Sequence, residues 1–85
     1  MIVFVTTADT EILALSRAAR DLPPEFPPLK AVNPVRLPPD LTPEALAAGA
    51  SLVLVRLLGG RRAWEQGFDG LASYCRRMEI GRAHV

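Results

Sequence analysis

Residues 51–64 read Ser-Leu-Val-Leu-Val-Arg-Leu-Leu-Gly-Gly-Arg-Arg-Ala-Trp, and this stretch decides how the rest of the chain is interpreted. Residues 52–58 are apolar except for Arg56, and they are rich in branched side chains. An apolar run of this kind that stops at a glycine pair is typical of a strand buried on both faces of a parallel sheet. The stretch therefore predicts that the chain forms a small α/β domain.

The end of this stretch forms a candidate anion site. Gly59 and Gly60 predict a sharp turn, because glycine adopts positive φ without a Cβ clash. Arg61 and Arg62 follow, where we expect the next helix to begin. Backbone N–H groups at a helix start, together with the helix dipole, attract a phosphate or carboxylate. The signal is weak, because neither a GxGxxG fingerprint nor a Walker lysine accompanies the turn.

Two shorter apolar runs precede this strand. Residues 2–5 predict a central strand that ends at Thr6-Thr7. Residues 29–32, or 29–35 at most, predict an edge strand, because Pro34 interrupts them. Strands that alternate with helices are joined by right-handed crossovers in a parallel sheet, and the expected spatial order is second, first, third. The expected fold is α/β, with a small three-stranded parallel sheet and flanking helices, an incomplete flavodoxin-like or Rossmann-like domain. The third strand is then left at a bare edge, which is unusual for so apolar a run.

Helices are expected after each of the three strands. We expect Asp9 or Thr7 to cap the first helix, which should end before Pro23. Thr42 is a natural N-cap for a brief second helix that ends near Gly49. A third helix is expected within residues 61–78, with an irregular start. Its apolar stripe, which should cover the sheet, consists of Trp64, Phe68, Leu71, Cys75 and Met78.

The composition of the chain excludes several classes of protein. At 85 residues it has room for one domain, and its net charge of +1 predicts no nucleic-acid partner. The single cysteine, Cys75, excludes an internal disulfide and a CxxC metal site, and it is interpreted as a small core residue. The chain has neither an apolar run of about 20 residues nor a basic leader, so we expect no membrane segment and a cytoplasmic protein.

The carboxyl ends of the strands are where a site is expected, because ligands of open parallel sheets bind there. Asp9 and Arg56 should meet at this edge, beside the turn formed by Gly59, Gly60 and Arg61. A guanidinium within a buried strand needs a partner. Arg56 is therefore interpreted either as structural, paired with Asp9 or with the backbone, or as a ligand-binding or interdomain residue. No set of residues suited to catalysis or to metal binding is predicted.

Three segments together resemble the amino terminus of the large subunit of cobaltochelatase, the CobN family, which is related to the magnesium chelatase large subunits. They are residues 2–14, residues 33–37 and above all residues 53–64, with Val-Arg-Leu-Leu-Gly-Gly-Arg. The resemblance implies a piece of a much longer subunit that inserts cobalt into the corrin precursor hydrogenobyrinic acid a,c-diamide during aerobic cobalamin biosynthesis. It also implies ATP hydrolysis by separate AAA-type partner subunits. Family residues that handle cobalt and corrin lie elsewhere, so this piece alone is expected to be inactive and to hold no cofactor.

The last seven residues, 79–85, read Glu-Ile-Gly-Arg-Ala-His-Val and resemble the translation of a common sequencing adapter. We therefore expect residues 1–78 to be a truncated amino-terminal α/β domain and residues 79–85 to be a non-native tail that packs poorly.

Two alternatives to a chelatase fragment remain open. One is a free-standing α/β interaction module. A receiver domain is disfavoured, because Thr6-Thr7 and Leu57-Leu58 stand where its acidic residues belong. The other is a small phosphate-binding protein that uses the turn formed by Gly59, Gly60 and Arg61.

Overall fold

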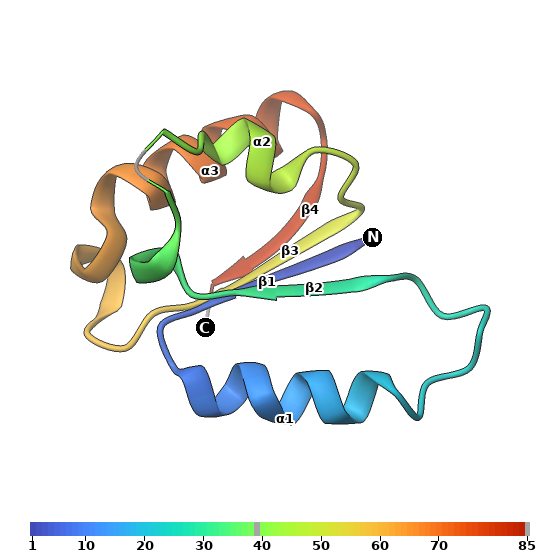
Figure 1. Ribbon diagram of the computed structural model, residues 1–85. Coiled ribbons are helices and arrows are strands. Elements are labelled where there is room, and N and C mark those ends of the chain that lie inside the picture. The colour runs from blue at the N-terminus through green and yellow to red at the C-terminus, as the bar shows by residue number, and fades with distance from the viewer. Residues whose placement is uncertain (39, 85) are drawn as a thin grey trace.

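The computed structural model describes residues 1–38 and 40–84 (Figure 1). Strands and helices alternate along the chain, with short 3₁₀ helices, η1 and η2, before α2 and α3. The elements are β1 (Ile2–Thr6), α1 (Asp9–Ala19), β2 (Leu29–Val32), η1 (Pro34–Arg36), α2 (Pro43–Ala47), β3 (Leu52–Arg56), η2 (Gly60–Trp64), α3 (Glu65–Arg77) and β4 (Gly81–His84).

The strands form one parallel sheet in the order β2-β1-β3-β4. Ile2 of β1 is paired with Leu29 of β2 on one side and with Leu52 of β3 on the other. The predicted α/β class is confirmed, as is the predicted order of the first three strands. The central position of β1 agrees with its β-branched and aromatic composition.

The prediction of three strands is wrong, because residues 81–84 form a fourth. β4 lies beside β3, with Leu52 paired with Gly81 and Val55 paired with His84. Ile80 is partly buried against the core, and its N–H donates to the Cys75 carbonyl at 2.9 Å. The expected poor packing is therefore also wrong for residues 79–84, and Val85 lies outside the described residues. The edge of β3 offers unpaired N–H and C=O groups, and the backbone of β4 satisfies them.

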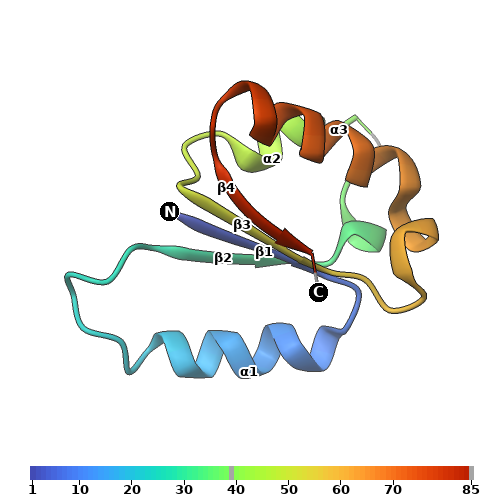
Figure 2. The same ribbon diagram turned by 180° about the vertical axis from the view of Figure 1, so that it is seen from behind.

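Helices cover the two faces of the sheet unequally. α2 and α3 lie on one face and α1 lies on the other (Figures 1 and 2). This follows from right-handed crossovers, since the chain moves in one direction from β1 to β2 and in the opposite direction from β2 to β3 and on to β4. The core lies under α2 and α3 and consists of Val3, Val5, Leu46, Ala47, Val53, Val55, Leu57, Leu71 and Cys75.

The ends of α1 differ from the prediction. Its N-cap is Ala8, whose methyl side chain cannot make a capping bond, and the side chains of Thr7 and Asp9 are bonded elsewhere. α1 ends at Ala19 and not just before Pro23. The N–H groups of Arg20, Asp21 and Leu22 donate to the carbonyls three residues earlier, so the chain leaves the helix through a tighter turn.

The helices α2 and α3 agree better with the prediction from the sequence. The Thr42 hydroxyl accepts from the Ala45 N–H at 3.1 Å, which confirms this N-cap, and α2 ends at Ala47, two residues before the expected glycine. α3 begins at Glu65 after the 3₁₀ turn of η2, so the helix start expected at Arg61 is wrong. Met78 lies beyond the end of α3 and is 58% exposed, so it does not continue the buried stripe.

Candidate functional site at the carboxyl edge of the sheet

The carboxyl ends of β1, β2 and β3 meet at one edge of the sheet, as the sequence predicts. Residues 6–11 follow β1 and begin α1, residues 33–36 follow β2, and residues 56–60 follow β3. Hydrogen bonds and ion pairs among these three segments join strand ends that are up to 51 residues apart in the sequence.

Arg56, the last residue of β3, forms an ion pair with Glu11 in the first turn of α1. The Thr6 hydroxyl donates to the other oxygen of this carboxylate, Glu11 Oε1, at 2.6 Å. The predicted pairing of Arg56 with Asp9 is therefore wrong. The Arg56 side chain is also 49% exposed, because it lies at the strand end on the face that α1 covers only in part. Arg56 thus ties β3 to α1 and still offers guanidinium surface to solvent.

Asp9 is held by residues that follow β2. Its Oδ2 accepts from Arg36 Nη2 at 2.5 Å, and its Oδ1 accepts from Asn33 Nδ2 at 3.0 Å. The hydrogen bond from the Arg36 guanidinium is the largest cause of a lowered pKa at the Asp9 carboxyl, and the hydrogen bond from the Asn33 amide is the second. Asn33 is buried, and it also donates to the Thr7 carbonyl at 3.3 Å and accepts from the Val35 N–H at 3.0 Å. Asn33 therefore fixes the end of β2 to the end of β1.

Sequence reasoning missed Asn33 and Arg36 as members of this edge. A signal was present, because an Asn-Pro pair directly after a strand is typical of a turn whose asparagine side chain caps the next segment. The resulting 3₁₀ turn, η1, brings the chain back toward α1. It follows that Arg36, four positions beyond the end of β2, can pair with Asp9 in the helix of the preceding crossover.

The ion pair between Asp9 and Arg36 predicts a measurable change in the pKa of the Asp9 carboxyl. Because Arg36 stabilises the charged carboxylate, the Asp9 pKa in the folded chain should lie below its ordinary value of 3.8. Its contribution to stability is then present above the unfolded pKa and is lost as the pH falls through the folded pKa. We expect Arg36→Gln to raise the Asp9 pKa, and Arg56→Gln to leave it unchanged. Carbon-detected NMR titration of the Asp9 carboxyl measures both; equal shifts in the two variants would contradict the geometry.

The glycine turn joins the end of β3 to η2. Gly59 and Gly60 have φ of 86° and 75°, so the predicted positive-φ turn is confirmed. The N–H of Gly60 donates to the Leu57 carbonyl at 2.9 Å, and the N–H of Leu58 donates to the Thr7 hydroxyl at 2.8 Å. Arg61 lies in η2, four residues before α3 begins. Two of the N–H groups at this turn are thus bonded within the chain, and anion binding by Gly59, Gly60 and Arg61 stays a prediction.

The charges at this edge are arranged in pairs. Asp9 lies with Arg36 and Glu11 lies with Arg56. The side chains of Arg36 and Arg56 are 71% and 49% exposed, which leaves room for a further carboxylate beside each of them. Within residues 1–38 and 40–84, no cluster of three or more His, Cys, Asp or Glu side chains is suited to a metal ion. The two ion pairs cross-link α1 to the ends of β2 and β3.

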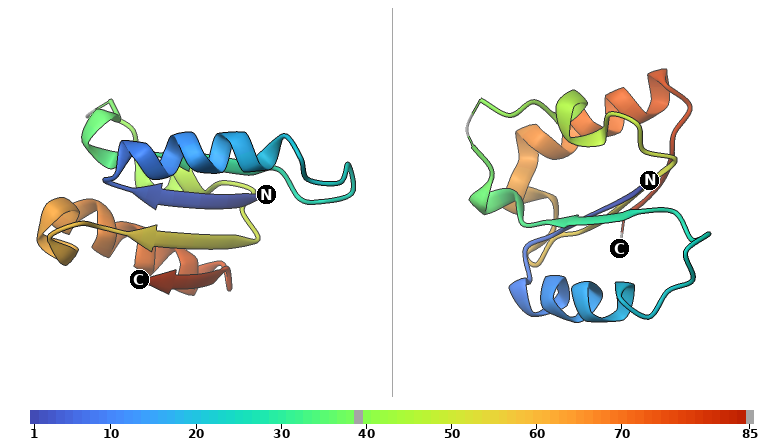
Figure 3. Two further views of the ribbon diagram at one scale, coloured as in Figure 1. Left: turned by 90° about the horizontal axis from the view of Figure 1, so that it is seen from below. Right: turned by 45° about the vertical axis from the view of Figure 1, so that its right-hand side comes forward.

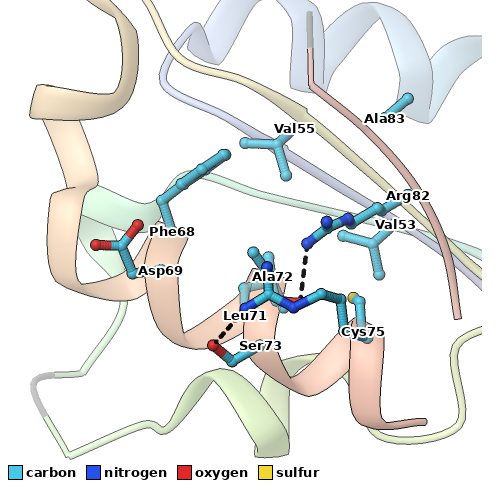
Figure 4. A pocket seen from close by; sticks show the side chains of 11 residues that line it. Val53, Val55, Phe68, Asp69, Leu71, Ala72, Ser73, Cys75, Arg82 and Ala83 are labelled. Atoms are coloured by element: carbon cyan, nitrogen blue, oxygen red, sulfur yellow. Dashed lines mark hydrogen bonds between the residues drawn. The ribbon is translucent and has the colours of Figure 1, made fainter. Parts of the chain in front are cut away.

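A cavity of about 600 Å³ lies between α3 and the strands β3 and β4 (Figure 4). Val53, Val55 and Leu71 form its apolar wall. Arg82 of β4 is paired with Val53 and therefore lies on the face that α3 covers, and its Nη1 donates to the Ala72 carbonyl at 2.9 Å. A charged residue thus occupies a position where β1 and β3 place valine. The cavity remains because this strand supplies little apolar volume toward α3.

Cys75 lines this cavity from α3 and is 1% exposed. Burial raises the pKa of its thiol, and the nearby Arg82 charge offsets only part of this effect. The core interpretation of Cys75 is confirmed by its burial. We expect Cys75 to react with a maleimide at least about tenfold more slowly than free cysteine at neutral pH, since the thiolate is the nucleophile. Reaction at the rate of free cysteine in the native chain would show that α3 does not cover this position.

Comparison with known proteins gives one informative similarity. The chain is 31% identical over 80 residues to the aerobic cobaltochelatase subunit CobN of Pseudomonas aeruginosa. The match covers 89% of this chain but only 6% of that subunit. It supports the resemblance to CobN seen in residues 2–14, 33–37 and 53–64, over a small part of the CobN chain. No protein-family model and no solved structure matches the chain.

Among the helices of residues 1–38 and 40–84, none has the length and apolar character needed to cross a bilayer.

Proposed function

We propose that this chain is the amino-terminal α/β segment of a cobaltochelatase large subunit. The observation that carries the proposal is the 31% identity to CobN over 80 residues, which extends through nearly the whole α/β unit. The strand-glycine-arginine segment at residues 53–64, which forms β3 and the turn after it, supports the same proposal from its sequence.

The reaction of the complete enzyme then follows as part of the proposal. The large subunit binds hydrogenobyrinic acid a,c-diamide and inserts cobalt, its metal substrate, into the corrin ring. AAA-type partner subunits hydrolyse ATP to drive this insertion, in aerobic cobalamin biosynthesis within the cytoplasm. This ligase chemistry belongs to the whole assembly. The rest of the large subunit and the AAA-type subunits are the proposed partners of this segment.

The segment itself has an architectural role in this proposal. Its edge is held together by the Asp9–Arg36 and Glu11–Arg56 pairs, which position α1 against the ends of β2 and β3. The guanidinium groups of Arg36 and Arg56 keep exposed surface that suits carboxylates of a neighbouring domain. Residues Arg56, Gly59, Gly60, Arg61 and Asp9 are therefore proposed to contribute to an interdomain contact.

A chimaera tests the proposal. Residues 1–78 of this chain replace the aligned segment of P. aeruginosa CobN, and cobalt insertion is assayed with the corrin substrate, ATP and the partner subunits. We expect activity within about tenfold of the natural subunit, because a homologous segment restores the same contacts. A matched chimaera that carries an unrelated α/β domain of similar size should be inactive. A well-folded chimaera as inactive as this control would overturn the proposal.

Phosphate binding at the glycine turn is the alternative, and it has its own measurement. The isolated chain is titrated with inorganic phosphate while the amide signals of Gly59, Gly60 and Arg62 are followed by NMR. The bonds from Gly60 to Leu57 and from Leu58 to Thr7 occupy two donors of the turn, so we expect only weak, unsaturated shifts. Saturable binding at millimolar phosphate would favour the alternative.

A further inference from the structure

The two faces of β3 are buried to different extents. Val53 and Val55, which lie under α2 and α3, are 0% and 5% exposed. Leu52 and Leu54 alternate with them on the opposite face and are only partly buried. Parallel sheets are normally covered on both faces, and their strands are apolar on both sides for that reason. The sequence of β3 therefore fits a strand that is covered on both faces, whereas the helices of this chain cover only one face of β3.

The uncovered area lies beside α1. In the view from below, α1 lies along β1 and β2, while β3 and β4 have no helix in front of them (Figure 3, left). Phe4 of β1 is paired with Leu54 of β3, and it is likewise only partly buried. Phe4, Leu52 and Leu54 therefore form an apolar strip along this face, which we name the open strip. Arg56 lies at the carboxyl end of the strip.

The side of α1 next to the open strip is suited to a neighbouring helix. Glu11 points toward β3, because it pairs with Arg56. Ala14 and Ala18 lie three and seven residues further along the same side of the helix, and both are exposed. Small side chains let two helices approach to about 8–10 Å between their axes. The open strip and these alanines therefore form adjoining surfaces against which a second helix can pack.

The described chain cannot supply this helix. Right-handed crossovers place α2 and α3 on the other face, and only the connection from β1 to β2 places a helix, α1, on this one. The chain corresponds to 6% of the length of the CobN subunit, so most of the polypeptide in the proposed full subunit lies outside it. A helix from that remainder is therefore the occupant that the topology and the length of the subunit favour.

We propose that an amphipathic helix from the rest of the large subunit packs beside α1 on the open strip. This inference rests on the proposed function. The helix presents apolar residues at i, i+3, i+4 and i+7 to Phe4, Leu52 and Leu54. It also places a carboxylate near Arg56, whose side chain is 49% exposed although it already pairs with Glu11. The open strip is thus an intramolecular docking surface.

Cysteine labelling tests the proposal in two settings, the 85-residue chain and the CobN chimaera described above. Leu54→Cys probes the strip, Leu52→Cys is a second probe in case the first perturbs folding, and Leu13→Cys, at a side chain that is 59% exposed, is the reference. Modification by a maleimide is followed at each position by peptide mass spectrometry, so that other cysteines do not interfere. We expect residue 54 to react readily in the chain, and at least tenfold more slowly relative to residue 13 in the chimaera.

The outcomes separate this inference from the proposed function. An active chimaera in which residue 54 stays as reactive as in the chain alone overturns the docking helix and leaves the proposed function standing. A folded but inactive chimaera overturns both. Protection of residue 54 in the chain alone that disappears on dilution would show that a second copy covers the strip, which also overturns the inference.

Discussion

Leu71→Ala is expected to lower the free energy of unfolding by about 2–5 kcal/mol, because it deletes buried apolar volume and leaves a cavity. Leu71 lies in the middle of α3, is 2% exposed and belongs to the core shared by α2, α3 and the sheet. A domain of this size has a total stability of about 4–13 kcal/mol. The variant should therefore lose a large share of the stability of the chain, as measured by urea titration with circular dichroism.

Leu13→Ala is the matched control for this change. It makes the same substitution within a helix, but Leu13 is 59% exposed. We expect a change within about 0.5 kcal/mol, because little apolar area is removed from the interior and alanine favours the helix. Equal losses in the two variants would contradict the assignment of the core to the α2 and α3 face.

Deletion of residues 79–85 is expected to produce the second large effect. The deletion removes β4, leaves the N–H and C=O groups of β3 unpaired, and exposes the core beside Ile80. We expect a loss on the order of 3 kcal/mol from the missing hydrogen bonds and apolar contacts. We also expect self-association, because a bare apolar edge strand pairs with other chains. Urea titration and size-exclusion chromatography measure the two effects.

Arg82→Ala is the control for the deletion. It removes the guanidinium and its bond to the Ala72 carbonyl but keeps the backbone of β4. We expect a change within about 1 kcal/mol and no self-association, since the pairing of β3 is retained. If the deletion behaves like this single substitution, β4 does not contribute to the stability of the chain.

Most of the fold could be predicted from the sequence, because its signals are local. The β-branched runs that form β1 and β3, the edge-strand signal of β2 and the Thr42 cap all depend on neighbouring residues. β4 could not be predicted in this way, because Gly81-Arg82-Ala83-His84 has neither alternation nor strong β-propensity. Its strand conformation depends on the unpaired edge of β3. The sequence did show that this edge needed a partner, although not which segment would provide it.

The sequence predicted where the candidate site lies, but not which of its charged residues form ion pairs with each other. Asp9 and Arg56 lie at the expected edge, yet they pair with Arg36 and Glu11. Asp9 and Glu11 are two residues apart in one helical turn, so they point in different directions around α1. Which of them faces β3 depends on the rotation of the helix against the sheet, and tertiary packing sets this rotation. Arg36 reaches Asp9 only because η1 turns the chain back after β2.

The genomic sequence that follows codon 78 tests the central claim most directly. We propose that the chain is one end of a cobaltochelatase large subunit, and that residues 79–85 do not belong to it. Long-read sequencing of the source locus should then show the reading frame continuing beyond Met78 into a subunit of CobN length, without the codons for Glu79 to Val85. Genomic DNA that encodes Glu79 to Val85 and then a stop codon would contradict the account.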